Sequence, residues 1–525
     1  MNRDLFNFWL PVKKKSSFNI RSFNINFGPQ HPAAHGVLRI ILQLRGEIIE
    51  RGDTHIGLLH RGTEKLVEER PYLLGLPYFD RLDYTAMLMQ EHAYCLAIEN
   101  ILGSNNYLSP FSNFRILFDE LTRILNHLTT LSTHSMDVGT MAVFFWAFEE
   151  RERIMEFYER ISGARMHVAL YRPNELTIRY ITSYFLKDIV FFCRDILKRI
   201  GQIESRLNTT TIWRARLVNI GIIYNENSFS WGITGPLARS AGLRRDLRLN
   251  YAETYGNYYY LTIRSFIGEN GDCYDRFLIR MREMVESIHI ILQIISNWFL
   301  NYNTWYSYFM QTRNHSGGLV LSNFDWWQNM EKLIDHFKYF SDGFNLPAGL
   351  TYQGIESAKG EFGVLMLTDG SAYPYRCRIR SPAYYHTQFF LPMTQGHYFA
   401  DLVTIIGSQD IVMGEVDRIS IYQFHSLVRS RLFLYYYILK YYINYRYFSI
   451  YRLCWFLSYL YPFQFNYIIY LIHFYGFNNY INQLKWICIF TGRQRGIINF
   501  FLSSRLVLLT KFQRARYRDI KYSDV

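Results

Sequence analysis

The chain has 525 residues, of which 49% are hydrophobic and 19% are charged. This composition excludes intrinsic disorder and a fibrous repeat, because a chain this long and this apolar buries a large core. The six cysteines lie far apart and form no C-x-x-C pair, which excludes a disulfide framework and any zinc or iron–sulfur site supplied by this chain alone.

The net charge of +13 is concentrated near the C-terminus. Residues 421–525 contain 14 Lys and Arg against 2 acidic residues, whereas residues 1–420 contain 43 basic and 42 acidic residues. Such a discontinuity marks a boundary between parts with different partners. We therefore divide the chain into an N-terminal extension (1–22), a central domain (23–420) and a basic, aromatic-rich C-terminal extension (421–525). The 18% share of aromatic residues is typical of an AT-rich genome and favours an organelle-encoded chain.

Alternating apolar residues at the start of the central domain predict strands. Phe23, Ile25 and Phe27 share one face, and the pattern stops at Gly28-Pro29. The segment VLRIILQLRGEIIERGDTHIG then predicts a β-hairpin that turns at Arg45-Gly46.

The loop GPQHPAAHG carries His31 and His35. Its two prolines forbid a regular helix, so this is not the helical histidine pair of a metal site. Taken alone, the two histidines fit either loop residues bonded to the backbone or hydrogen-bond donors to a ligand carbonyl.

From about Arg61 the apolar period becomes helical. Residues spaced at i, i+3, i+4 and i+7 from Phe114 to Leu131 predict a long helix, and further helices are predicted after Asp137 and after Asp272. Strand character returns in GVLMLTDGSAYPYRCRIR, with a turn at Asp369-Gly370. We expect an α+β fold that is mostly α-helical, with a helix bundle and a small antiparallel β element.

Several polar motifs have simple structural explanations when each is taken alone. HRGTEKL places Arg61 and Lys65 on one helical face, like an ordinary charged surface. FDRLDY opens the next predicted helix, where Tyr84 fits a core tyrosine. Asp137 is an N-cap candidate between two predicted helices, and His167 lies in GARMHVALYRP.

Together the motifs resemble the quinone-pocket subunit of respiratory complex I, subunit 7 of NADH:ubiquinone oxidoreductase. The resemblance runs in one order from about residue 23 to residue 418 through NFGPQHPAAHGVLR, HIGLLHRGTEKLVEERPYLLGLPYFDRLDY, ITGPLARSAGLRRDLR, GDCYDRFLIRMREM, ESAKGEFGVLMLTDGSAYPYRCRIRSP and IIGSQDIVMGEVDR. It implies a core subunit of an oxidoreductase that transfers electrons from NADH to ubiquinone and pumps protons. It also implies a place among other complex I subunits, on the matrix side of the mitochondrial inner membrane and in peripheral contact with that membrane.

The resemblance implies roles residue by residue. His35 and Tyr84 match the pair that hydrogen-bonds the quinone carbonyl, and Asp137 matches the carboxylate beside that histidine. Arg61 and His167 match residues that line a terminal [4Fe–4S] cluster ligated by a neighbouring subunit. We therefore expect catalytic roles for His35, Tyr84 and Asp137, ubiquinone as substrate, and no cofactor bound by this chain alone.

The same family is related to the large subunit of nickel–iron hydrogenases, which implies a hydrogenase-like helix bundle. Val412 and Glu415 stand where hydrogenases have one pair of metal-binding cysteines, and Phe79–Tyr84 contains no cysteine. A nickel–iron centre needs thiolates, so we expect no metal site and exclude a hydrogenase. The resemblance implies that the former metal cavity now receives a quinone headgroup. The nearly neutral residues 1–420 argue against a chain that binds RNA throughout.

Two interpretations of the C-terminal extension stay open. Residues 453–484 carry no charge, but polar residues interrupt them, which argues against a spanning helix. Further on, CIFTGRQRG resembles the C-terminal half of protein S-fourteen of the small ribosomal subunit, which implies rRNA binding by Arg493, Arg495 and Arg505. The alternative is a structural extension that packs on complex I subunits or lipid headgroups.

Overall fold

The computed structural model describes residues 22–103, 110–173, 175–176, 182–250, 254–300 and 330–418. The α-helices are α1 (Thr63–Glu68), α2 (Tyr72–Asp80), α3 (Met87–Leu102), α4 (Pro110–Val138), α5 (Met141–Ser162), α6 (Ser183–Thr209), α7 (Thr211–Leu217), α8 (Asn225–Ser230), α9 (Pro236–Ser240), α10 (Cys273–Leu300), α12 (Met330–Ser341), α13 (Pro382–Thr394), α14 (Phe399–Gln409) and α15 (Met413–Val416). Two short 3-10 turns are η3 (Pro32–Ala34) and η5 (Gly256–Tyr260). The strands are β1 (Ser22–Phe27), β2 (Arg39–Arg45), β3 (Ile48–His55), β4 (Tyr171–Arg172), β5 (Glu175–Leu176), β6 (Gly349–Ser357), β7 (Gly360–Thr368) and β8 (Arg376–Arg380).

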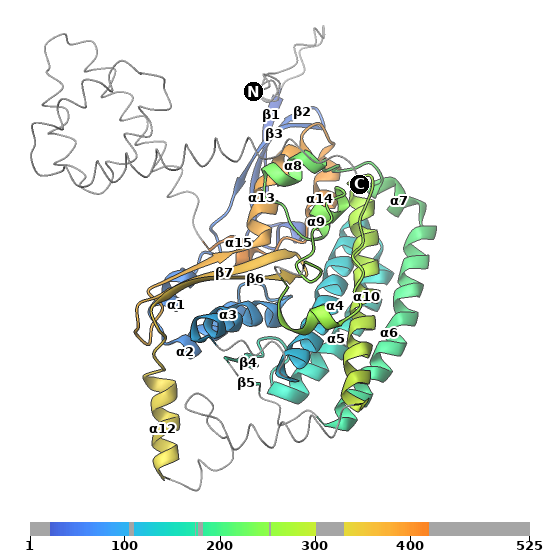
Figure 1. Cartoon of the computed structure of the whole chain (residues 1–525). Coiled ribbons are helices and arrows are strands. Elements are labelled where there is room, and N and C mark those ends of the chain that lie inside the picture. Colours follow the sequence, from blue (N-terminus) through green and yellow to red (C-terminus); the bar gives the residue numbers. More distant parts are fainter. Residues whose placement is uncertain are drawn as a thin grey trace, which may run out of the picture. The chain divides into compact units, whose positions relative to one another are not determined.

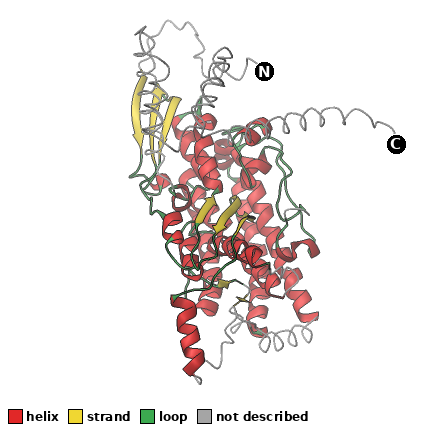
Figure 2. Ribbon diagram, turned by 60° about the vertical axis from the view of Figure 1, so that its left-hand side comes forward, coloured by secondary structure: helices red, strands yellow, loops and turns green. Residues whose placement is uncertain are grey.

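The long helices α4, α5, α6 and α10 lie side by side as a bundle (Figures 1 and 2). Helix α4 contacts both α5 and α10, and the apolar residues that predicted it, such as Phe114, Leu121 and Leu128, are buried. It also buries polar side chains, among them Arg123 and Asn126. A helix that is buried on its polar as well as its apolar side lies at the centre of the molecule.

The strands form small antiparallel sheets. Strands β1, β2 and β3 pair in that order, and the hairpin turns between Arg45 and Ile48 as predicted. Strands β6, β7 and β8 form a second sheet that packs on α3, while β4 and β5 make a two-residue pair. One continuous apolar core joins the sheets to the bundle. The prediction of a mostly helical α+β fold with a small antiparallel β element is confirmed.

Three local predictions are wrong. Asp137 does not precede a helix, because α4 continues to Val138 and ends only where Gly139 adopts a φ of 101°; Thr140 is the N-cap of α5. Tyr84 does not open a helix but lies in the turn between α2 and α3. Arg61 precedes α1, so it shares no helical face with Lys65.

A helix that spans the membrane can be looked for only in the residues that the structure describes. No helix in the described ranges is both long and apolar enough to span a bilayer. The uncharged stretch 453–484 and the three arginines Arg493, Arg495 and Arg505 lie outside the described residues.

Candidate functional site

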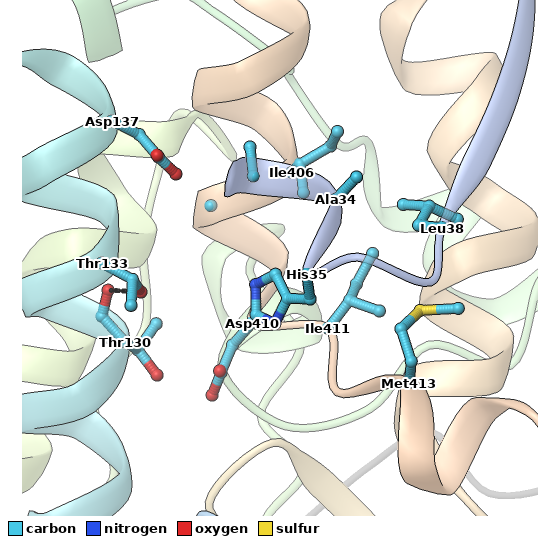
Figure 3. Close-up of a pocket in the computed structure, with 12 residues that line it drawn as sticks. Ala34, His35, Leu38, Thr130, Thr133, Asp137, Ile406, Asp410, Ile411 and Met413 are labelled. Atoms are coloured by element: carbon cyan, nitrogen blue, oxygen red, sulfur yellow. Dashed lines mark hydrogen bonds between the residues drawn. The ribbon is translucent and has the colours of Figure 1, made fainter. Parts of the chain in front are cut away.

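A small cavity of about 30 Å³ lies where three segments meet (Figure 3). The segments are the loop around η3, helix α4, and the end of α14 with the residues after it; η3 and α4 both pack on α14. The residues that line the cavity are Ala33, Ala34, His35, Leu38, Thr130, Thr133, Asp137, Ile406, Gly407, Asp410, Ile411 and Met413. The structure thus brings His35 and Asp137, two of the expected catalytic residues, into one cavity.

His35 is held by the turn that its own loop forms. Pro32 begins η3, and the His31 imidazole accepts a hydrogen bond from the Ala33 backbone at 3.1 Å. His31 is therefore a loop histidine bonded to the backbone. His35 ends the turn in the left-handed region, with φ 53°, and its side chain projects into the cavity (Figure 3). This conformation is uncommon outside glycine and is concentrated at functional sites.

Asp410 lines the same cavity as His35 and shares its unusual backbone conformation. It follows α14 with φ 55°, and its carboxylate accepts a hydrogen bond from the Asn126 amide at 2.7 Å. Burial lowers the pKa of His35, and the negative charge of Asp410 opposes that shift while Lys359 adds to it. Asp410 is thus the carboxylate that acts on the His35 imidazole. Sequence reasoning missed it, because only the tertiary approach of α14 to the η3 loop places it there.

Asp137 lies in the last turn of α4, one turn beyond Thr133 (Figure 3). Burial raises the pKa of its carboxyl to about 6. The C-terminal end of a helix is also an unfavourable place for a negative charge. Asp137 therefore changes charge close to neutral pH, inside the cavity that His35 lines.

Tyr84 reaches the same charged groups from the α2–α3 turn. Burial raises the pKa of its phenol, Asp83 and Asp410 raise it further, and Lys359 opposes them. The same two charges, Asp410 and Lys359, thus act on both Tyr84 and His35, although Tyr84 is not among the residues that line the cavity of His35.

Lys359 is the second residue of this site that sequence reasoning missed. It occupies the tight turn between β6 and β7, and its Nζ atom is buried. The ammonium donates to both oxygens of Asp83 at 2.9 and 2.8 Å, and to Thr85 and Asn126 at 2.7 Å each. Asp410 lies 3.7 Å away. The only sequence signal was a lysine before the turn glycine in ESAKGEF.

Arg61 and His167 lie together at the other end of the α2–α3 turn. The exposed Arg61 guanidinium donates a hydrogen bond to the backbone oxygen of Arg81. Burial lowers the pKa of His167, and both arginines lower it further, while Asp80 opposes them. The buried Nδ1 of His167 has no hydrogen-bond partner among the described residues.

The described residues contain no cluster of three or more His, Cys, Asp or Glu arranged to hold a metal ion. The cysteines among them, Cys95, Cys193, Cys273 and Cys377, are all buried and free.

Comparison with known proteins gives one consistent result. The family model described as the 49 kDa subunit of respiratory-chain NADH dehydrogenase matches residues 137–418. The NADH-ubiquinone oxidoreductase 49 kDa subunit of Paramecium tetraurelia is 52% identical over 400 residues, which cover 76% of this chain and 100% of that protein. The subunit of the same name from Cafeteria roenbergensis is 48% identical, over 77% of this chain and 99% of that protein. NADH dehydrogenase (ubiquinone) iron-sulfur protein 2 of Arabidopsis thaliana is 47% identical, over 76% of this chain and 98% of that protein. The resemblance found in the sequence is confirmed, and the chain belongs to the family of the 49 kDa subunit of respiratory-chain NADH dehydrogenase.

Proposed function

We propose that this chain is the core subunit of complex I that forms the ubiquinone-reduction site, and that the cavity beside His35 receives the quinone headgroup. One observation carries the proposal: the buried Asp410–Lys359 pair acts both on His35, which lines the cavity, and on Tyr84, a second proton-bearing side chain from a distant segment. Family membership supports the overall role, which is electron transfer from NADH to ubiquinone coupled to proton pumping.

Reduction of a quinone to a quinol takes two electrons and two protons. Tyr84 donates one proton from its phenol, and His35 is placed to donate the other. Since burial raises the pKa of Tyr84, the phenolate left behind is costly and must regain a proton quickly. Since burial lowers the pKa of His35, its charged form depends on a nearby carboxylate, and Asp410 supplies one.

The electrons come from the terminal [4Fe–4S] cluster of a partner subunit, which supplies one-electron transfer when bound. The exposed guanidinium of Arg61 and the unpartnered Nδ1 of His167 fit a role beside such a group. Positive charge at Arg61 favours the reduced, more negative state of a neighbouring cluster.

The cavity is too small for a quinone ring as it stands. An apolar cavity that binds benzene has a volume of about 150 Å³, whereas this cavity measures about 30 Å³. Binding therefore requires the η3 loop to move away from α4, and we propose that contact with partner subunits holds it open.

The relation to nickel–iron hydrogenases supports the same placement. We propose that the bundle is hydrogenase-like and that the two segments without cysteines, Phe79–Tyr84 and Val412–Glu415, surround the former metal cavity. A Cβ atom on Gly414 would lie 2.3 Å from the Leu82 backbone oxygen, so these segments touch. The same proposal places the chain on the matrix side of the mitochondrial inner membrane, encoded by the organelle.

The test is the rate of quinone reduction by assembled complex I that carries Tyr84→Phe. Loss of a positioned proton donor lowers the rate by about 10²–10⁴-fold, while NADH:ferricyanide activity, which bypasses the quinone, should be unchanged. His35→Ala should behave in the same way. The control is Tyr274→Phe, which removes a phenol that bonds Asn208 at 3.0 Å between α10 and α6 and should retain normal activity. Normal quinone reduction by the Tyr84→Phe complex would refute the assignment.

For residues 421–525 we propose a fused rRNA-binding unit. The excess of basic residues begins where the family match ends, at residue 418, and TGRQRG lies downstream. The full-length chain should bind structured RNA with an affinity that falls steeply as the salt concentration rises. The double substitution Arg493→Ala with Arg495→Ala should weaken this binding. A chain that shows no salt-dependent RNA binding supports the structural extension instead.

A further inference from the structure

Behind the cavity lies a buried cluster with more acid than base. The Lys359 ammonium donates hydrogen bonds to both oxygens of Asp83, and the Asp410 carboxylate lies 3.7 Å from the same Nζ atom. The Asn126 amide joins the two sides, because its oxygen accepts from Lys359 and its nitrogen donates to Asp410. One buried positive charge is thus shared by two carboxylates.

Glu415 adds a third carboxyl to this cluster. It lies in the short helix α15, which packs so closely on the α2–α3 turn that a side chain at Gly414 would overlap the Leu82 backbone oxygen. Glu415 is 1% exposed, and its Oε1 atom has no hydrogen-bond partner among the described residues. Burial, with the negative charge of Asp83, raises the pKa of Glu415 to about 8. Glu415 therefore keeps its proton at neutral pH, since a third negative charge around Lys359 is unfavourable.

The surrounding charges agree with a protonated Glu415. The ionisable groups on the elements packed against α15, or directly after it, are Arg81, Asp83, Tyr84, Lys359, Tyr384, Tyr385, His386, Asp417 and Arg418. Arg418 is paired with another carboxylate, Glu64, at 3.2 Å. His386 is buried and its pKa is lowered to about 3, so it brings no charge.

We propose that Glu415 is the proton store of this site and that it replaces the proton Tyr84 gives to the quinone, by way of Asp83 and Lys359. The inference rests on the proposed function. In the transfer, the O–H bond of Glu415 breaks and its proton moves to the Asp83 carboxylate. The Lys359 ammonium gives a proton to the Tyr84 phenolate and takes the one held by Asp83. The negative charge ends on Glu415, the O–H bond of Tyr84 is restored, and no group is oxidised or reduced.

The transfer has a consequence that a structural role would not have. Above about pH 8 Glu415 loses its proton in the resting state, so it has no proton to supply and quinone reduction slows as the pH rises through that value.

The experiment compares assembled complex I carrying Glu415→Gln with the unmodified complex. Glutamine matches the size of the protonated carboxyl but has no proton to give. Glu415→Gln should lower kcat about 10²-fold, leave the KM for ubiquinone unchanged and remove the alkaline fall near pH 8. The matched control is Glu286→Gln, a buried glutamate on α10 that accepts a hydrogen bond from the Arg264 backbone N–H, which should keep both the rate and the alkaline fall.

Normal kcat and an intact alkaline fall in Glu415→Gln would overturn the proposal. If that variant does not assemble, Glu415→Asp is used instead, because it keeps a carboxyl but changes its position. An alkaline fall at the same pH as in the unmodified complex would then also overturn the proposal. Tyr84→Phe, measured in parallel, separates the two claims. Low activity of Tyr84→Phe beside normal activity of Glu415→Gln refutes only the store, whereas normal activity of Tyr84→Phe refutes the quinone site itself.

Discussion

His35 and Asp410 line one cavity, and each holds a left-handed backbone conformation. Such a conformation costs about 1–3 kcal/mol for a residue other than glycine. The surrounding fold stabilises it in two residues that line the same cavity. The loop position of His35 could be predicted, because the prolines and glycines around it exclude a regular helix. The position of Asp410 beside that loop could not be predicted, because nothing in the local sequence shows that the end of α14 meets the loop.

Asp137 is the residue whose charge should limit activity at acidic pH. Its pKa is raised by burial to about 6, so its carboxylate is present above that pH and is lost as the pH falls through it. We propose that the Asp137 carboxylate returns a proton to His35, which lines the same cavity, so quinone reduction by the assembled complex should fall as the pH drops below about 6. Asp137→Asn should lower the rate about 10–10²-fold at neutral pH and remove this acid limb from the pH profile.

The control for Asp137→Asn is Asp188→Asn, which changes an exposed carboxylate on α6 that pairs with Arg160. It should leave both the rate and the acid limb unchanged. If Asp137→Asn retains a normal acid limb, another group sets the charge in the cavity and Asp137 has no such role.

At the scale of elements, periodicity predicted α4, α10 and the β2–β3 hairpin, because each repeats one pattern over many residues. It did not predict where α4 ends, since a glycine rather than a change of pattern ends it. It also gave no sign that α15 packs on the α2–α3 turn. That contact joins segments more than 300 residues apart and depends on the missing side chain of Gly414.

Gly414→Ala should therefore separate α15 from that turn. The added Cβ atom would lie 2.3 Å from the Leu82 oxygen, and such overpacking costs about 1–3 kcal/mol. We expect less assembled complex and a lower urea concentration at half-inactivation of quinone reduction. The control is Gly201→Ala, which enters open space within α6 and should be neutral or stabilising by up to about 1 kcal/mol. Equal stability of the two variants would show that the close packing at Gly414 does not matter.

At the scale of the whole molecule, the sites expected from the sequence occupy the two ends of one turn. The turn from Arg81 to Tyr84 contacts Arg61 at its start and carries Tyr84 at its end. Electrons entering beside Arg61 and His167 and protons released beside Tyr84 and His35 would therefore meet across a few residues. The motifs predicted the residue types, but the buried charges that join them, Lys359 and Asp410, appear only in the folded chain.

The most direct measurement of this account is photo-crosslinking of assembled complex I with an azido-ubiquinone, followed by identification of the labelled peptides. The account predicts label in this chain on peptides that line the cavity, from the η3 loop, the end of α4 or residues 406–413, and loss of label when unmodified ubiquinone competes. Label that ubiquinone displaces but that falls only on other segments or other subunits would contradict the placement of the quinone site beside His35.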